Sequence, residues 1–115
     1  MDNSMTDEQI KAITKLMKSI SHPIRFKILY LLQDQEISVG DLRDQLDTTS
    51  SNITQHLNIL RNQGIIDIRK DSNYIYNKIT DPRIIELMRK MNQLYFSGSD
   101  GFLNDSGRNS TTTLL

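Results

Sequence analysis

The sequence predicts a mostly α-helical fold that carries one small β-hairpin. Between residues 7 and 63, apolar residues recur at helical spacing in four segments, which turn-forming residues separate. After Gly64 the period of the apolar residues changes from about 3.6 to about 2, which is typical of strands. Helical spacing returns after Asp81-Pro82. The predicted order of elements is therefore α-α-α-α-β-β-α.

The first two helices are predicted over residues 7–20 and from Pro23 to about Gln33. Thr6 is typical of an N-cap, and two acidic residues follow it in the first turn. Ser21-His22-Pro23 ends the first helix and starts the second, because proline is tolerated at a helix start but not inside a helix.

The third helix is short and is followed by a tight turn. Ser38 is a plausible cap for it, and Leu42 and Leu46 supply its apolar side. Asp47 and Thr48 then form the turn. This arrangement brings the fourth helix close behind the third.

The fourth helix is predicted from the cap Thr49 to about Gln63. Gly64 is placed to end it, because glycine readily adopts the left-handed conformation of the C′ position. The start of this helix is rich in hydroxyl and amide side chains, while one apolar face runs along its length. That face contains Ile53, Leu57 and Leu60.

Two strands and a last helix complete the predicted domain. Ile66 and Ile68 alternate with charged residues, residues 71–73 have turn chemistry, and alternation resumes from Tyr74. Tyr74 and Tyr76 share one face of the second strand and are expected to pack against the helices. Asp81-Pro82 starts the last helix.

The domain is expected to span residues 1–96 and to be followed by a flexible polar tail at 97–115. The tail composition, SGSDGFLNDSGRNSTTTLL, cannot bury enough apolar surface to order itself. With 115 residues, of which 37% are hydrophobic and 24% charged, the chain suits one compact domain with a modest core.

The composition also bears on the compartment and on the class of protein. The chain contains no cysteine, which excludes disulfides, thiolate metal sites and cysteine redox switches. Neither a signal peptide nor an apolar run long enough to span a bilayer is visible, so we expect a cytoplasmic protein without membrane contact. Fourteen basic and fourteen acidic residues give a formal net charge of zero, which is unusual for a nucleic-acid binder.

A short helix, a tight turn, a second helix and a hairpin describe a helix-turn-helix with a wing. Four stretches, covering most of residues 10–96, carry a more specific pattern: SHPIRFKILYLL at 21–32, EISVGDLRDQL at 36–46, SSNITQHLNILRNQGII at 50–66 and RKDSNYIYNKITDPRI at 69–84. In order and spacing they resemble the arsenic-repressor (ArsR/SmtB) family of winged-helix transcription regulators.

The resemblance implies a homodimer formed mainly by the first and last helices. It also implies a repressor that binds an inverted-repeat operator and is usually released by a metal ion or another signal. The predicted dimer interface consists of apolar residues on the two helices: Ile13, Leu16, Met17, Met88, Met91, Leu94 and Tyr95.

The polar start of the fourth helix is the predicted DNA-reading element, because these residues reach base edges in a helix-turn-helix. Gln55 is the strongest candidate, since glutamine can pair with adenine through two hydrogen bonds. Arg61 is expected to contact phosphate. The wing tip is expected to approach the DNA backbone or minor groove. The predicted DNA-binding residues are Thr49, Ser50, Ser51, Asn52, Thr54, Gln55, Arg61, Arg69, Lys70 and Asn73.

The metal sites of the family are not expected in this chain. Metal-responsive relatives carry Glu-Leu-Cys-Val-Cys-Asp-Leu where this sequence reads EISVGDL at 36–42, with serine and glycine in place of the thiolates. Other relatives bind zinc through the last helix, where Asp81 is present but Arg83, Leu94 and Ser97 occupy the other ligand positions.

The two histidines are expected to have structural roles. His56 lies beside the apolar face of the fourth helix, and His22 precedes the helix-starting proline. They are far apart in the sequence and make a poor metal site. We therefore expect no metal, no cofactor and no release from DNA by zinc, cadmium, arsenite or peroxide. The effector is either absent or a small organic ligand.

Two other functions compete with DNA binding. A winged-helix module that binds proteins and no longer binds DNA is consistent with the zero net charge. An enzyme is the weakest alternative, because the sequence shows no glycine-rich phosphate loop, no nucleophilic cysteine and no convincing Ser-His-Asp or paired-carboxylate set.

Overall fold

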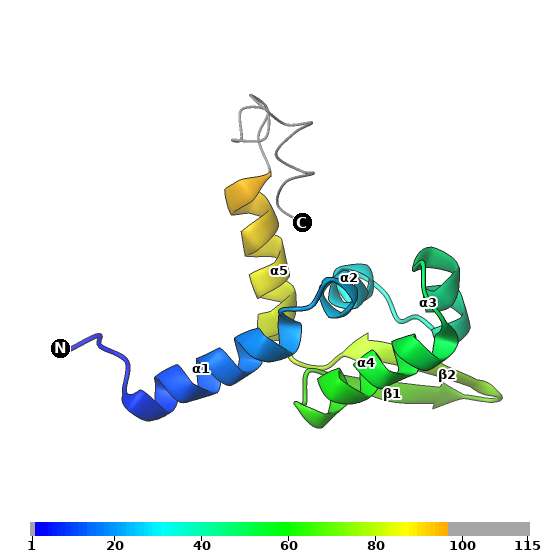
Figure 1. Cartoon of the computed structure of the whole chain (residues 1–115), viewed down its shortest axis with the longest axis horizontal. Coiled ribbons are helices and arrows are strands. Elements are labelled where there is room, and N and C mark those ends of the chain that lie inside the picture. Colours follow the sequence, from blue (N-terminus) through cyan, green and yellow to red (C-terminus); the bar gives the residue numbers. More distant parts are fainter. Residues whose placement is uncertain (1, 97–115) are drawn as a thin grey trace. The chain divides into compact units, whose positions relative to one another are not determined.

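The computed structural model describes residues 2–96 and confirms the predicted order of elements (Figure 1). The chain divides into two compact units, Met1–Asp81 and Pro82–Leu115. The first contains α1 (Asp7–Ile20), α2 (Pro23–Leu32), α3 (Val39–Gln45), α4 (Ser50–Asn62), β1 (Ile66–Asp71) and β2 (Tyr74–Ile79), and the second contains α5 (Pro82–Tyr95). The tail predicted over 97–115 lies outside the described residues.

Each of the four helices of the first unit begins at a side chain that accepts a hydrogen bond from its first turn. These N-caps are Thr6, His22, Ser38 and Thr49. Thr6 and Gln9 bond to each other's backbone N–H groups and form a capping box. The caps satisfy amide groups that a helix start leaves without intrahelical partners, and so they fix where each helix begins.

Gly64 ends α4 as the sequence predicts. Its φ of +73° lies in the left-handed region, where a side chain would be strained. The Gly64 N–H donates to the carbonyl of Arg61 at 2.9 Å, and the Ile65 N–H donates to that of Leu60 at 3.1 Å. These bonds satisfy the last helical carbonyls and direct the chain into β1.

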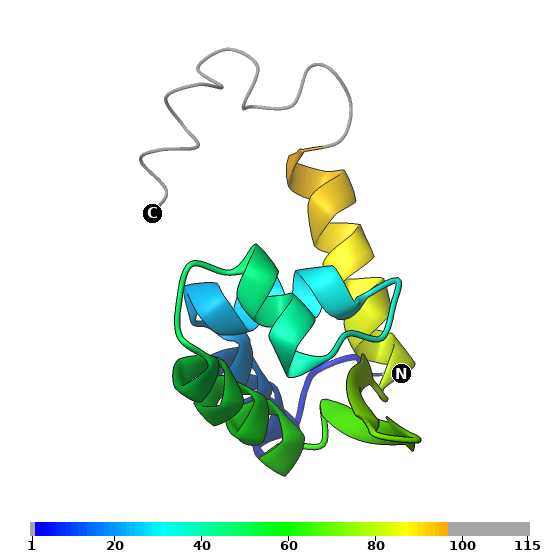
Figure 2. The ribbon, with the colours of Figure 1, turned by 90° about the vertical axis from the view of Figure 1, so that its right-hand side faces the viewer.

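The core of the first unit forms around α4. Its predicted apolar face is buried, with Ile53, Leu57 and Leu60 all 0% exposed. Helices α2 and α3 and strand β1 pack on this helix, and α4 and the hairpin lie together at one end of the unit (Figure 2). Burial of the apolar face leaves the opposite face of α4 exposed to solvent.

The hairpin pairs β1 with β2 from Ile66 opposite Ile79 to Asp71 opposite Tyr74. A third short segment joins it, because Ile37 and Asn77 exchange both backbone hydrogen bonds, at 3.1 and 2.8 Å. The side-chain amide of Asn77, 1% exposed, donates to the Ile37 carbonyl at 3.0 Å. The connection before α3 is thereby tied to the wing.

The expectation that the two wing tyrosines pack against the helices is wrong for Tyr74. This side chain is 63% exposed, and its ring stacks on that of Tyr76 with centroids 6.2 Å apart. Two aromatic residues at i and i+2 lie on the same strand face and can pack on each other. Tyr76 is half-buried.

Helix α5 presents several apolar side chains to solvent. Leu94 is 71% exposed and Tyr95 53%, whereas Met88 is 3% exposed. The place of Met88 in a dimer interface stays a prediction. Within residues 2–96, no helix is long and apolar enough to cross a membrane.

Replacing Gly64 by alanine should lower the free energy of unfolding by about 1 kcal/mol, because the new Cβ would be strained at positive φ. Gly40→Ala is the matched control. Gly40 lies within α3, where a Cβ would meet only the Ser38 hydroxyl oxygen at 4.0 Å. Helix propensity predicts unchanged or slightly higher stability there. Urea denaturation of both variants measures the difference, and a loss at Gly40 as large as that at Gly64 would contradict the assignment.

Candidate nucleic-acid interface

Some side chains at the start of α4 form hydrogen bonds with one another and with the backbone of its first turn. The hydroxyl of Thr49 accepts from the Asn52 N–H at 3.1 Å, and the side-chain amide of Asn52 donates to the Thr48 hydroxyl at 2.9 Å. Ser50 and Asn52 are half-buried. Thr49 and Asn52 therefore use part of their hydrogen-bonding capacity within the helix tip, and their contact with DNA stays a prediction.

The outer face of α4 carries only uncharged polar side chains. They recur at helical spacing and are all exposed. The sequence prediction missed two of them, Asn58 and Asn62, which extend the stripe toward the end of the helix; the signal that could have revealed them is their i+4 spacing. No acidic residue occurs in α4. The exposed stripe consists of Ser51, Thr54, Gln55, Asn58 and Asn62.

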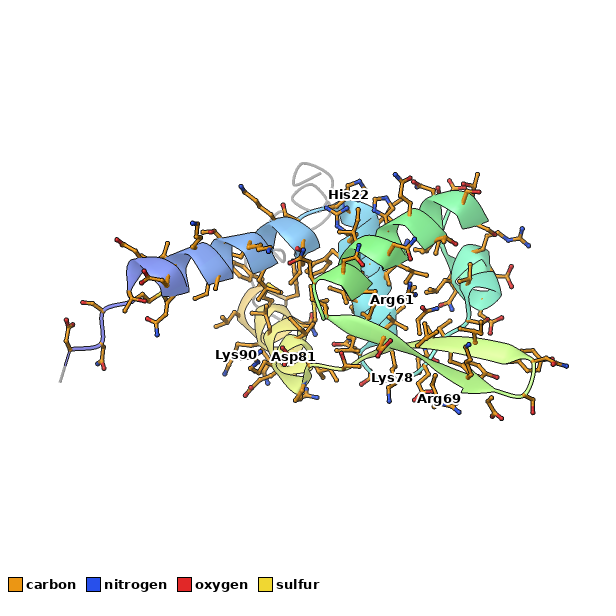
Figure 3. All side chains as sticks on the ribbon, turned by 90° about the horizontal axis from the view of Figure 1, so that it is seen from below. His22, Arg61, Arg69, Lys78, Asp81 and Lys90 are labelled. Atoms are coloured by element: carbon orange, nitrogen blue, oxygen red, sulfur yellow. The ribbon has the colours of Figure 1, made fainter. Side chains whose placement is uncertain are left out.

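Arg61 is the only charged residue of α4, and the structure holds it in place. Its Nη1 donates to the side-chain oxygen of Asn58 at 2.7 Å. Its Nε is buried without a hydrogen-bond partner in the part of the chain that the structure describes. Figure 3 shows Arg61 near the end of α4. The contact with Asn58 brings a cation against the polar stripe.

In the wing, the charge of Arg69 is largely offset by neighbouring groups. Its Nε donates to Glu36 Oε1 at 2.5 Å, and its Nη1 lies 3.7 Å from Asp71 Oδ2. The hydrogen bond to Glu36 raises the pKa of Arg69 above its already high ordinary value. The guanidinium also lies 5.1 Å from the centre of the Tyr76 ring. Arg69 thus joins the wing to the segment before α3. Figure 3 shows Arg69 at the hairpin.

The other two predicted wing residues lie at or near the exposed tip of the hairpin. Lys70 and Asn73 are both exposed. Lys70 forms no ion pair within residues 2–96. It is therefore the wing cation best placed to meet a phosphate group.

The two histidines, which the sequence places far apart, lie side by side in the structure. Their ring centroids are 4.3 Å apart. The Nδ1 of His22 accepts from the Ile24 N–H at 3.1 Å, and the Nδ1 of His56 lies 3.1 Å from Nη1 of Arg25. Because arginine can only donate, His56 must accept and is held in its neutral form.

The surroundings of the histidine pair disfavour a metal ion. One nitrogen of each ring is already engaged, and the positive charge of Arg25 is adjacent. Elsewhere in residues 2–96, no three histidine, aspartate or glutamate side chains gather where they could share an ion. The pair instead connects the start of α2 with the middle of α4.

Comparison with known families shows that residues 22–67 match the bacterial regulatory proteins of the arsR family. The matched range runs from the N-cap of α2 through α3 and α4 into β1. It therefore includes the whole helix-turn-helix and the exposed polar stripe.

Curated relatives share most of the chain. The transcriptional activator HlyU of Vibrio cholerae is 30% identical over 91 residues, which cover 79% of this chain and 83% of that protein. The biofilm growth-associated repressor of Xylella fastidiosa is 26% identical over 89 residues, which cover 77% of this chain and 78% of that protein.

Solved structures of regulators from the same two organisms have the same fold. HlyU from Vibrio cholerae superimposes with a TM-score of 0.73 at 27% identity, covering 78% of this chain and 98% of that one. The transcriptional repressor BigR from Xylella fastidiosa superimposes with a TM-score of 0.70 at 26% identity, covering 82% of this chain and all of that one.

The environment of His56 predicts that acid destabilises the protein. Burial, and then the nearby charges of His22 and Arg25, lower the pKa of His56 below its ordinary value of 6.5. Below pH 6.5 the unfolded chain therefore binds more protons than the folded one, and the free energy of unfolding falls as the pH drops through this window.

Urea denaturation between pH 7.5 and pH 5.0 measures this effect. His56→Asn retains an acceptor near the position of Nδ1 but cannot titrate, so its stability should change less than that of the wild type over the same range. Equal pH dependence of the two proteins would show that His56 is not the responsible group.

Proposed function

The chain belongs to the arsR family of bacterial regulatory proteins, and on that premise we propose that it is a sequence-specific DNA-binding transcriptional regulator that acts as a repressor. It would bind an inverted-repeat operator as a homodimer. Helix α4 would enter the major groove, and the wing would approach the adjacent backbone. The relatives include both an activator and a repressor, and occupation of an operator is the step common to both.

The exposed polar stripe of α4 is the observation that carries this proposal. Hydroxyl side chains can serve as donors or acceptors, and amide side chains can pair with adenine through two hydrogen bonds. The absence of acidic residues from α4 means that no carboxylate of this helix would repel phosphates. The buried apolar face behind the stripe keeps the reading side chains on a rigid support.

Apolar side chains on two helices support self-association. On α1, Ile10, Ile13 and Met17 are 47%, 39% and 60% exposed, and α5 exposes Leu94 and Tyr95. Exposed apolar stripes of this kind favour burial against a second copy. In a twofold dimer, the two α4 helices would meet half-sites about one helical turn apart, roughly 34–36 Å.

We further propose that the protein does not respond to thiophilic metals or to oxidants through the sites its relatives use. The sequence has no cysteine, and serine and glycine stand where metal-responsive relatives carry two thiolates. Regulation would come either from the abundance of the protein or from a small organic effector.

Gln55→Ala should relax base preference at one position in each half-site, with a cost of about 1–3 kcal/mol there. Arg61→Ala should instead weaken binding to every sequence and reduce its salt dependence, because phosphate contacts carry no sequence information. The two variants can be compared on duplexes selected from fragments of the host genome.

Gln63→Ala is the matched control for Gln55→Ala, since Gln63 is an exposed glutamine at the C-cap of the same helix. It should retain the wild-type profile. If Gln55→Ala and Arg61→Ala gave identical sequence profiles, the proposal that Gln55 reads a base while Arg61 contacts phosphate would be refuted. If wild-type protein shifted no duplex even at low salt, the chain would be a winged-helix module for protein partners.

A charge in the apolar stripe of α5 should disrupt the dimer. Met91→Asp or Leu94→Asp would place a carboxylate in a surface that must be desolvated on association, and should yield monomers or insoluble protein. Gln93→Asp adds the same charge at an exposed polar position and should remain dimeric. Analytical ultracentrifugation distinguishes monomers from dimers. If Met91→Asp and Leu94→Asp both remained dimeric, the assignment of α5 to the dimer interface would be wrong.

A further inference from the structure

The proposed reading surface is short of positive charge. Arg61 is the only charged residue of α4, and Arg69 in the wing is offset by Glu36 and Asp71. Lys70 remains available near the wing tip. Yet affinity for DNA derives largely from lysine and arginine side chains that neutralise phosphates. Cations on neighbouring surfaces would add to this affinity.

Helix α1 carries the densest group of lysines in the first unit. Lys11, Lys15 and Lys18 recur at i, i+4 and i+7 and are all exposed. Lys11 lies one turn beyond the acidic residues Asp7 and Glu8, which start the helix, and Lys15 and Lys18 lie further along it. None of the three forms an ion pair within residues 2–96. We call these three side chains the lysine face.

The lysine face lies opposite the apolar side of α1. Successive residues of a helix are separated by about 100°, so the three lysines fall roughly half a turn away from Ile13 and Ile20. A partner that covers the apolar side would therefore leave the lysines exposed. Like charges at i and i+4 destabilise a helix, and an anionic partner would remove this repulsion.

The end of α1 that carries Lys18 is tied to the helix that carries the polar stripe. Arg25 donates to the carbonyl of Ser19 at 2.6 Å and to that of Lys18 at 3.4 Å, while its Nη1 contacts His56 of α4. The end of α1 is thereby fixed beside α4, and Figure 3 shows both helices along one side of the unit with the hairpin along the other.

The dimensions of the lysine face suit a phosphate backbone. Seven residues of helix span about 10 Å. Each strand of DNA carries one phosphate for about every 3.4 Å of the duplex axis. A span of about 10 Å corresponds to about three such steps along the duplex axis, so the lysine face is long enough to lie beside several phosphates of one strand.

We propose that the lysine face of α1 is a second DNA-binding surface, which contacts operator phosphates outside the segment read by α4 and the wing. This inference rests on the proposed function and identifies where its electrostatic affinity originates. Lys11, Lys15 and Lys18 contribute affinity without base preference, and the stripe of α4 contributes base preference with little charge.

The test compares two variants that each lose three positive charges. Lys11→Gln/Lys15→Gln/Lys18→Gln removes the lysine face, and Lys27→Gln/Arg89→Gln/Lys90→Gln removes exposed charges elsewhere. Affinity is measured against salt concentration for the selected operator and for an unrelated duplex. Ultracentrifugation first establishes that both variants have the oligomeric state of the wild type.

The lysine-face variant should lose at least tenfold in affinity for both duplexes and keep its base preference. The slope of log K against log salt should become less steep by about 0.9 for each lost phosphate contact, which is about 5 for the six lysines of a dimer. The control variant should change the slope by less than about 1, since long-range charge alone has a small effect on the number of phosphate contacts.

Three outcomes would overturn the inference. The slope could stay unchanged in the lysine-face variant while the wild type binds the operator normally, which would leave the proposed function intact. The loss could be confined to the operator, which would indicate base contacts. Wild-type protein could be retained on phosphatidylserine vesicles while the salt dependence of DNA binding is the same in the wild type and in the lysine-face variant. This result would assign the lysine face to a membrane surface. Failure of the wild type to bind any duplex would instead refute the proposed function itself.

Discussion

The guanidinium of Arg25 joins three helices and ties α4, the helix proposed to read DNA, to the end of α1. Its Nε and Nη2 donate to carbonyls in the last turn of α1, where a helix lacks internal donors and where its dipole favours a cation. Its Nη1 contacts His56 in α4. Because arginine stays charged and only donates hydrogen bonds, His56 must keep its proton on Nε2. One side chain of α2 therefore fixes the end of α1, the tautomer of a buried histidine and the contact between α2 and α4.

Local features of this structure could be predicted from the sequence, because local interactions determine them. The caps Thr6, Ser38 and Thr49 and the terminator Gly64 act within a few residues of their own positions. The apolar face of α4 follows from spacing alone. The contacts between Arg25 and His56 and between Ile37 and Asn77 join residues 31 and 40 positions apart in the chain. No periodicity indicates such pairs, so neither the proximity of the histidines nor the third segment beside the hairpin could be anticipated.

The candidate site shows the same limit at the level of side chains. The residue types at the start of α4 suggested several positions that could contact bases. Residue type alone does not reveal which of these side chains form hydrogen bonds within the helix start. Asn52 bonds to Thr48 and is half-buried, whereas Asn58, nearly two turns further along, is exposed on the outer stripe and positions Arg61. The angular position of a residue on a helix decides whether it can reach a ligand, and that position follows from the buried face. The whole buried face of α4, which consists of Ile53, His56, Leu57 and Leu60, separates the two asparagines: at about 100° per residue Asn58 lies further round the helix from this face than Asn52 does.

A net charge of zero governs properties such as solubility and long-range steering, whereas a contact with DNA depends on where individual charges lie. In this chain the carboxylates of Glu36 and Asp71 lie beside Arg69 and offset its positive charge. These two acidic residues therefore contribute to the zero net charge by acting on the wing. Helix α4 carries no carboxylate, and the three lysines of α1 have no acidic partner within residues 2–96. Screening limits the interaction of exposed charges to about 8–10 Å at physiological salt, so acidic residues on distant faces have little influence on a phosphate held against α1. The neutral composition is therefore compatible with a locally positive surface, and base reading and phosphate binding can reside on different helices of one small domain.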